Sequence, residues 1–215
     1  MTDFPLQSDL SFARELADLA DAISMGRFRA TDLVVTTKPD MSPVSDADKA
    51  VENALRGAVL DSRPGDSILG EEFGVVGESS RQWIIDPIDG TKNYVRGVPV
   101  WATLIALAVD GVPVVGVVSA PALGKRWWAS EGNGAHLSET AFGPAGSGVV
   151  SHERRIHVSQ VSELADASSS CSGITRWEDA GKLDAYLRLA RKVWRTRDYG
   201  DMWPYMMVAE GLLDV

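Results

Sequence analysis

A chain of 215 residues with 45% hydrophobic and 24% charged residues is long enough to bury a core, as one large domain or two small ones. Its 21 basic and 30 acidic residues give a formal net charge of −9, which argues against a general nucleic-acid binder, because such proteins normally present a basic surface. No apolar run reaches the roughly 18–20 residues that a membrane span needs, and the first residues lack the pattern of a secretory signal. The single cysteine, Cys171, permits no intrachain disulfide, which agrees with the cytoplasmic location that we expect.

Two amphipathic helices are predicted in the first third of the chain. From Ser8 to Met25, apolar residues recur at helical spacing and acidic residues occupy the other face. A turn-rich stretch with two prolines follows, and apolar residues then repeat at helical spacing again, up to Leu60. Ser45 or Asp46 is the expected N-cap of this second helix, which places Asp48 in its first turn.

The middle of the chain is predicted to form strands. Residues 67–72 have the pattern of a short strand that ends in two acids, and residues 82–87 (QWIIDP) have that of a second strand. Apolar runs on both sides of an Asp-Gly pair predict a β-hairpin over 102–121, because Asp-Gly is a strong turn signal. A further strand pair is predicted over 125–137, around a Gly-Asn-Gly turn.

The last third of the chain is predicted to alternate strands and helices. Residues 139–151 are rich in Gly, Ala and Ser and predict a surface loop. This loop favours a boundary between an N-terminal α+β domain (1–150) and a partial C-terminal α/β domain (151–215). The elements expected after it are a strand at 154–160, a helix at 178–193, a strand at 194–200 and a helix at 201–213 capped by Asp201. Periodicity alone therefore predicts a mixed α and β fold.

Carboxylates recur where the predicted strands and helices begin or end. The set comprises Asp46, Asp48, Glu71, Glu72, Asp86 and Asp89. Any one of these acids alone is more readily a helix cap or a turn residue, since Asp-Pro and Asp-Gly are common in turns. Glu71 and Asp86, however, each follow a short apolar strand, so we expect both at one edge of a shared sheet. The structural alternative, in which all the acids are caps and turns, predicts no stabilisation by metal ions.

Acids clustered in this way need a cation. Two or three carboxylates at one site raise each other's pKa unless a positive ion lies between them. Oxygen ligands suit Mg²⁺, which usually keeps some waters for a substrate phosphate, and the lack of a His or Cys ligand set favours Mg²⁺ or Mn²⁺ over zinc. The three histidines, at positions 136, 152 and 157, show no ligand spacing and are expected to be surface or structural residues.

The Gly90-Thr91 pair after these acids indicates an anion site. Glycine lets the backbone approach a ligand closely, and a helix that begins at Thr91 would direct free N–H groups to the same place as the aspartates. Metal ions beside such N–H groups form a phosphate pocket, in which two metals can clamp the phosphate and activate water for in-line attack.

Together these motifs resemble those of the inositol monophosphatase-like, magnesium-dependent phosphatases. The resemblance rests on WIIDPIDGTKNY (83–94), GEE (70–72) and PVSDADKAVE (43–52), with the hairpin, RIHVSQ and RTRDYGD following in the family's order. It extends over nearly the whole chain. It implies a layered α-β-α-β-α sandwich of the α/β (α+β) class, a small phosphorylated substrate, no nucleic-acid or membrane partner, and a homodimer.

The resemblance implies a set of metal ligands. Glu71, Asp86 and the main-chain carbonyl of Ile88 would hold a first metal ion, Mg²⁺ or alternatively Mn²⁺. Asp86 would bridge to a second ion held by Asp89. Lys38 would lie near the mouth of the site on a mobile loop.

The resemblance also implies residues for phosphate binding and catalysis. Asp89, Gly90 and Thr91 would bind the phosphate group, the last two through backbone N–H groups. Thr91, paired with Asp48, would orient or deprotonate the attacking water, and Glu71 would assist.

The flanking residues resemble the histidinol-phosphatase branch of this family, of actinobacterial type. Lys92 stands where inositol-directed members more often carry a second threonine. Three tryptophans also fit the branch, at positions 101, 127 and 128, although core packing is the more ordinary role of such residues. Asp201 would meet the amine of the substrate, and Arg197 would be either a structural residue or a partner on its phosphate side. The implied reaction converts L-histidinol phosphate and water to L-histidinol and phosphate, in L-histidine biosynthesis.

Two alternatives to this function stay open. Within the enzyme class, the alternative is an inositol-1-monophosphatase or a broad-specificity sugar phosphatase. The family's last metal aspartate lies in a W-D-x-A motif beyond the helix that ends near Leu213, and the given sequence stops at Val215. Either the protein is truncated or that segment lies outside the given sequence, so we expect the second metal to lack a ligand here. An inactive metal- or phosphate-binding relative is therefore the non-enzyme alternative.

Overall fold

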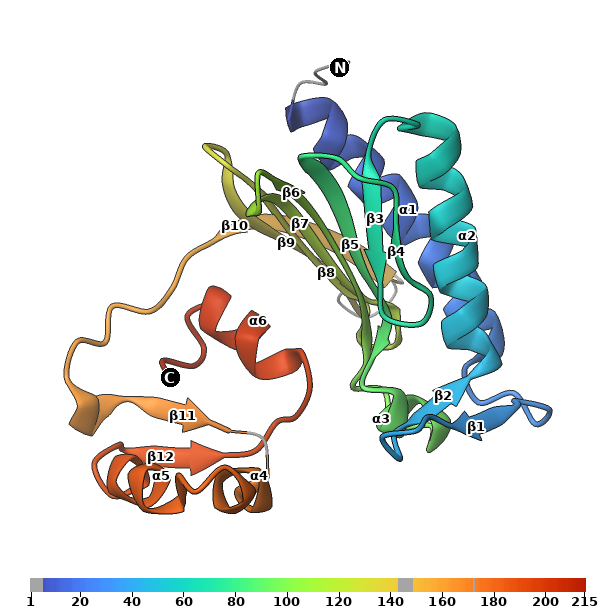
Figure 1. Ribbon diagram of the computed structural model, residues 1–215. Helices are drawn as coiled ribbons and strands as arrows, with labels where there is room; N and C mark the ends of the chain where they lie inside the picture. Colours follow the sequence, from blue (N-terminus) through green and yellow to red (C-terminus); the bar gives the residue numbers. More distant parts are fainter. Residues whose placement is uncertain (1–5, 143–148, 172) are drawn as a thin grey trace. The chain divides into compact units, whose positions relative to one another are not determined.

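The computed structural model describes residues 6–142, 149–171 and 173–215. The chain divides into two compact units, Met1–Arg155 and Ile156–Val215, whose elements are labelled in Figure 1. The predicted domain boundary at 150/151 falls within strand β10 (Val149–Ile156). Among the helices of the described ranges, none combines the length and the hydropathy that crossing a membrane would require.

An eight-stranded sheet forms the first unit, in the spatial order β10-β9-β8-β7-β6-β5-β3-β4 (Figure 1). Strand β3 runs parallel to β5, whereas β4 pairs antiparallel with β3, and β5 to β9 form an antiparallel series. Besides β10, the strands are β3 (Ser67–Gly70), β4 (Gly74–Val76), β5 (Arg81–Asp89), β6 (Ala102–Val109), β7 (Val112–Ala120), β8 (Lys125–Ser130) and β9 (Gly134–Phe142).

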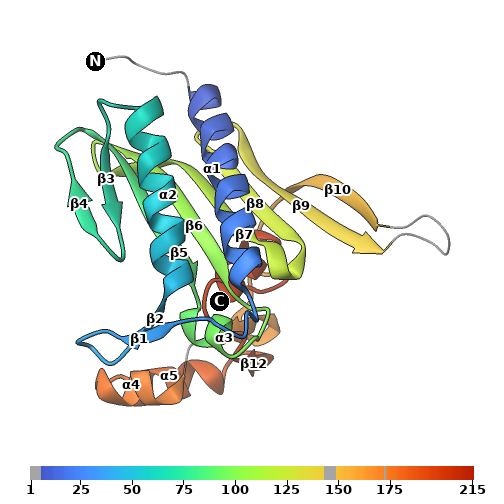
Figure 2. The same cartoon turned by 90° about the vertical axis from the view of Figure 1, so that its right-hand side faces the viewer.

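Two long helices, α1 (Leu6–Arg27) and α2 (Asp46–Ser62), cover one face of this sheet (Figure 2). Their apolar sides pack on alternate residues of the strands, because successive side chains of a strand point to opposite faces. Phe12 of α1 meets Trp83 of β5 edge to face, with ring centroids 5.3 Å apart. The core between helices and sheet includes Leu16, Val51, Leu55, Ile68, Trp83, Ile85, Ile105, Leu107 and Trp128.

Smaller elements lie at one end of the sheet. Strands β1 (Val35–Thr37) and β2 (Pro43–Ser45) form an antiparallel hairpin that leads into α2, and the short helix α3 (Thr91–Val95) follows β5 (Figure 1). A second, small core packs here, from Ala47, Ile88, Tyr94 and Trp101. A single-turn 3-10 helix, η1 (Pro121–Leu123), follows β7.

The second unit contains a two-stranded parallel sheet, β11 (Ser168–Ser170) with β12 (Arg195–Arg197). Its helices are α4 (Ile174–Asp179), α5 (Leu183–Ala190) and α6 (Trp203–Ala209), and a 3-10 turn, η2 (Leu164–Asp166), precedes β11. Main-chain hydrogen bonds from Asp214 N to Ser168 O (2.9 Å) and from Ser170 N to Val215 O (2.8 Å) tie residues 214–215 to β11.

Several elements predicted from the sequence are confirmed. The first helix is α1, and the second is α2 with Ser45 as its N-cap. The hairpin over 102–121 is β6–β7, and both residues of its Asp-Gly turn have positive φ, 50° at Asp110 and 79° at Gly111. The strand pair over 125–137 is β8–β9.

Other predicted boundaries were wrong. The strand predicted at 67–72 ends at Gly70, so its two acids lie in the following turn. Within the loop predicted at 139–151, residues 139–142 and 149–151 belong to β9 and β10, and 143–148 lie outside the described residues. The strand predicted at 154–160 ends at Ile156.

Two helix predictions in the second unit also need correction. The helix predicted at 178–193 is interrupted between α4 and α5, where Gly181 has φ +67°, a left-handed conformation that ends a helix. Asp201 is not a helix cap, since α6 begins at Trp203 with Met202 before it. Pro204 lies in the first turn of α6 as predicted, where its missing N–H has no partner to lose.

Candidate active site

The parallel pairing of β3 and β5 brings two of the predicted acids to one edge of the sheet. Gly70 is in register with Ile85, so Glu71 and Asp86 are the next residues along each strand. Glu71 N donates to Ile85 O at 3.2 Å, which carries the pairing one residue further. The chain thus presents one carboxylate just after the end of β3 and another beside it in the last part of β5.

The end of β5 departs from regular geometry. Its register with β6 shifts between Asp86 and Asp89. Thr103 of β6 donates its hydroxyl to the carbonyl oxygen of Pro87 (2.8 Å), which fixes this irregular stretch to the sheet. Gly90 then takes a left-handed conformation, with φ 88°, and helix α3 begins at Thr91. A residue with a side chain would be strained at Gly90, so glycine permits the sharp turn from strand to helix.

Thr91 links this turn to helix α2. Its hydroxyl lies 3.1 Å from Asp48 Oδ1 and 3.0 Å from Ile88 O, and donates to one of these acceptors at a time. Asp48 is fully buried in the first turn of α2, where its Oδ2 accepts from the main-chain N–H of Ser45 at 2.8 Å and from the Ser45 hydroxyl. This capping box explains why Ser45 and Asp48 occupy these positions.

Burial raises the pKa of the Asp48 carboxyl above its ordinary value, although the hydrogen bonds from Ser45 and Thr91 lower it. In the Asp48 carboxyl, Oδ2 is therefore held by Ser45 at the helix cap, and Oδ1 faces the hydroxyl of Thr91.

Asp86 is the most perturbed carboxyl of the site. Burial, followed by the charges of Glu71 and Asp89, raises the pKa of Asp86 to about 9. Its Oδ1 is buried and has no hydrogen-bond partner among the described residues. A buried carboxylate oxygen in this state requires a proton or a cation.

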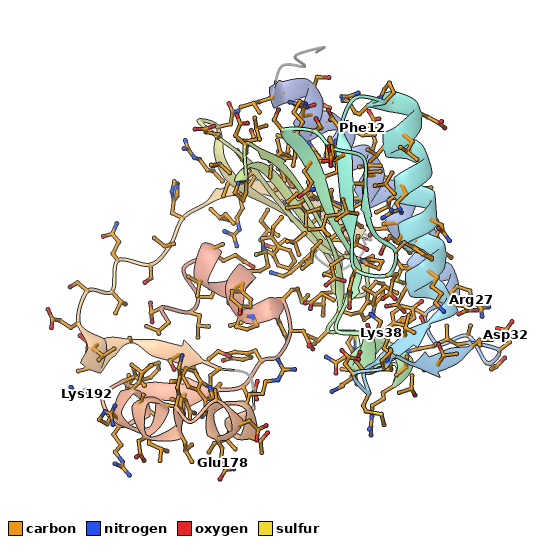
Figure 3. All side chains as sticks on the ribbon, in the orientation of Figure 1. Phe12, Arg27, Asp32, Lys38, Glu178 and Lys192 are labelled. Carbon is orange, nitrogen blue, oxygen red and sulfur yellow. The ribbon has the colours of Figure 1, made fainter. Side chains whose placement is uncertain are left out.

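Lys38 contacts two acids of this site (Figure 3 labels it, beside the β1–β2 hairpin). Its Nζ lies 2.8 Å from Glu71 Oε1 and 2.7 Å from Glu72 Oε1. Burial lowers the pKa of the Lys38 ammonium, but the hydrogen bonds to Glu71 and Glu72 outweigh this and raise it above its ordinary value. Within the described ranges no three His, Cys, Asp or Glu side chains converge as a ready metal-ligand group.

Arg197 and Asp201 belong to the second unit. Arg197 is exposed on β12, and its guanidinium donates to the Thr196 carbonyl oxygen at 2.7 Å. Asp201 precedes α6 with φ 48° and lines a cavity of about 120 Å³, together with Cys171 and Tyr205 among others.

The tryptophans at 101, 127 and 128 are 0%, 3% and 5% exposed, which confirms the core role that we favoured for them. Trp101 packs edge to face on Tyr94, with centroids 4.9 Å apart. His136 stacks on Trp128 with centroids 5.8 Å apart, and His152 and His157 are exposed, as expected of surface or structural residues.

Glu52 is a residue near the site that sequence reasoning missed. It is fully buried on α2 and accepts hydrogen bonds from the main-chain N–H groups of Glu72 (2.7 Å) and Phe73 (3.1 Å). The available signal was a glutamate on the apolar face of a predicted helix, beside Val51 and Leu55, since a fully buried acid is rare unless it is paired.

Known proteins resemble this chain in sequence and in fold. The model of the inositol monophosphatase family matches residues 6–215. A histidinol-phosphatase of Streptomyces coelicolor is 59% identical over 211 residues, covering 96% of this chain and 76% of that protein. A histidinol-phosphatase of Mycobacterium tuberculosis is 52% identical over 208 residues, with the same two shares covered, 96% and 76%. The structure of an inositol monophosphatase from Zymomonas mobilis aligns with a TM-score of 0.78 at 29% identity, covering 99% of this chain and 76% of that one, which confirms the predicted fold.

Proposed function

The chain belongs to the inositol monophosphatase family, and from this premise we propose that it is a magnesium-dependent phosphatase that hydrolyses L-histidinol phosphate to L-histidinol and phosphate, a step in L-histidine biosynthesis. The observation that carries the choice of substrate is the 59% and 52% identity to two histidinol-phosphatases over 96% of the chain. The acids and the Gly-Thr turn at the ends of β3 and β5 support the class of reaction.

Phosphatases of this family are metal-dependent, and we propose Mg²⁺ as the ion, with Mn²⁺ able to replace it. The residues fit such an ion, because the donors are all oxygens and the partnerless Oδ1 of Asp86 would gain a cation. Glu71, Asp86 and the carbonyl of Ile88 would hold one ion, and Asp86 and Asp89 a second. When bound, a divalent ion would polarise the phosphoryl group and lower the pKa of water.

Thr91 Oγ1 is the atom that we propose accepts a proton from the attacking water. It can do so because its own proton can pass to Asp48 Oδ1, 3.1 Å away. Ser45 holds the other oxygen of Asp48, so the accepting oxygen keeps its direction toward Thr91. Glu71 would assist in orienting the water. In the reaction the water oxygen bonds to phosphorus, the phosphorus–oxygen ester bond breaks, and the departing alkoxide takes up a proton.

The backbone after β5 would hold the phosphate. The left-handed Gly90 opens the turn, and we propose that the N–H groups of Gly90 and Thr91, with Asp89 beside them, contact the phosphate oxygens. We further propose that Asp201 meets the substrate amine and Arg197 its phosphate side. We likewise propose that the chain forms a homodimer and that its domains divide at 150/151.

A comparison of substrates tests this function. Phosphate release is measured with L-histidinol phosphate, inositol 1-phosphate and fructose 1,6-bisphosphate, each with Mg²⁺ and with a chelator. We expect the highest kcat/KM for L-histidinol phosphate and no release with the chelator. Much faster turnover of inositol 1-phosphate would show that the branch assignment is wrong. Unchanged activity of Asp89→Asn would contradict the assigned site.

A further inference from the structure

The turn that carries Glu71 and Glu72 is held by a single buried carboxylate. This acidic turn (residues 71–73) connects β3 to β4, and α2 lies beside both strands in Figure 2. Its three consecutive main-chain N–H groups are all bound. Glu71 N donates to β5, as described above, while Glu72 N and Phe73 N both donate to Glu52, to Oε2 at 2.7 Å and to Oε1 at 3.1 Å.

Burying the Glu52 charge completely is costly, so the arrangement needs compensation. Arg56, one helical turn further along α2, supplies part of it by donating to Glu52 Oε1 at 3.1 Å. The same NH1 atom lies 2.9 Å from Gly74 O, just beyond the acidic turn. Glu52 therefore holds the backbone within this turn, and Arg56 holds the carbonyl that directly follows it, through charge-assisted hydrogen bonds.

Gly70 makes this approach possible. A Cβ added to Gly70 would overlap Oε1 and Cδ of Glu52, so no larger residue fits unless the carboxylate moves. The first residue of the Gly-Glu-Glu motif is thus explained by the space that Glu52 needs.

Helix α2 carries two such anchors. Asp48 and Glu52 are four residues apart, so they lie on the same face of the helix. Asp48 contacts Thr91 after β5, and Glu52 holds the acidic turn after β3. Helix α2 therefore fixes the distance between the Gly90-Thr91 turn after β5 and the acidic turn after β3.

We propose that Glu52 is a positioning residue, which acts through the acidic turn to hold Glu71 where a divalent metal ion binds; this inference rests on the proposed function. Both carboxylate oxygens of Glu52 already accept hydrogen bonds from Glu72 N, Phe73 N and Arg56, so we assign it no direct contact with the metal or the substrate. Outer hydrogen-bond partners of metal ligands commonly alter metal affinity or activity by about 10- to 100-fold.

The test compares Glu52→Gln with Asp66→Asn. Glutamine leaves an amide NH₂ facing one of the two N–H groups of the turn, so that hydrogen bond is lost. Asp66 is a matched control, because it is a buried carboxylate just before β3, at the strand's other end, paired to Arg81 at 3.0 Å. Both variants should melt at a lower temperature than the wild type, but only Glu52→Gln should weaken Mn²⁺ binding measured by calorimetry, by about 10-fold or more.

A shortened acid separates position from charge. Glu52→Asp keeps the buried charge but draws the carboxylate back from the turn, so we expect it to weaken Mn²⁺ binding as well. Wild-type affinity in both Glu52 variants, or an equal loss in Asp66→Asn, would overturn the proposal.

Hydrogen exchange on the wild type provides a measurement that does not depend on folding of a variant. The amides of Glu72 and Phe73 should be protected although they lie outside any strand, and rapid exchange there would also overturn the proposal. If the wild-type protein itself neither binds Mn²⁺ nor releases phosphate, the proposed function fails instead, and the two failures are distinct.

Discussion

The ammonium of Lys38 lies 2.8 Å from Glu71 Oε1, so a side chain that follows β1 contacts a residue that we propose as a metal ligand. The same ammonium contacts Glu72 at 2.7 Å. A divalent ion held by Glu71, as proposed above, would therefore compete with the Lys38 ammonium for this carboxylate.

Replacing Lys38 by methionine should consequently strengthen metal binding. Partly exposed ion pairs contribute up to about 1 kcal/mol, which corresponds to an affinity for Mn²⁺ about fivefold higher in the variant. Titration calorimetry measures this directly. Lys49→Met is the matched control, because Lys49 is an exposed lysine of α2. Weaker binding in Lys38→Met would show that Lys38 assists the metal rather than competing with it.

Removing the proton acceptor of Thr91 should slow the chemical step. Asp48→Asn is expected to reduce kcat by about 100-fold or more, the usual effect of losing a group that takes part in proton transfer. Thr91→Ser keeps the hydroxyl and should retain most of the activity. Asp46→Asn is the control, because Asp46 is an acid of the same helical turn for which no hydrogen bond to Thr91 is seen among the described residues. Steady-state kinetics should give this variant a kcat close to that of the wild type. Equal kcat for Asp48→Asn and wild type would exclude the proposed proton path.

The pKa of Asp86, raised to about 9 by burial and then by Glu71 and Asp89, gives the metal-free protein a specific pH dependence. Between the ordinary aspartate pKa of 3.8 and about 9, the folded chain holds a proton on Asp86 that the unfolded chain has lost. The free energy of unfolding should therefore fall as pH rises through this interval, by up to about 1.4 kcal/mol per pH unit from this group.

Denaturant unfolding in the presence of a chelator, at several pH values from 5 to 9, measures this slope for the wild type and for Asp86→Asn. The variant should have a smaller slope, since asparagine does not titrate. Identical slopes in the two proteins would show that Asp86 titrates normally.

Local signals made much of this fold predictable. Helix α1 and the β6–β7 hairpin follow from apolar periodicity and an Asp-Gly turn, which depend on residues close in the sequence. The common edge of Glu71 and Asp86 could be expected because each acid follows an apolar strand, and the parallel register of β3 and β5 bears this out.

Features that depend on distant contacts were not predictable in this way. Glu52 binds N–H groups twenty or more residues further along, and no local pattern indicates such partners. The β1–β2 hairpin, with a proline at the start of β2, was expected only as a turn-rich stretch. The ion-pair partners of Lys38, which lies between its strands, are Glu71 and Glu72, far along the sequence. The break between α4 and α5 depends on a single glycine that helical spacing does not reveal.

Gly70→Ala should disturb the fold and the metal site together. The added Cβ would overlap the Glu52 carboxylate, so we expect a loss of about 1–3 kcal/mol in the free energy of unfolding, as is usual for overpacking a buried position. Gly57→Ala is the matched control, because a Cβ at Gly57 meets nothing within 4 Å and alanine favours a helix by roughly 0.5–1 kcal/mol over glycine. Urea unfolding should thus find Gly57→Ala as stable as the wild type or more so. Glu52 must move away from the acidic turn to admit the methyl group, so Gly70→Ala should also bind Mn²⁺ more weakly. If the variant is destabilised but its Mn²⁺ affinity is unchanged, the packing at Gly70 does not control the position of Glu71.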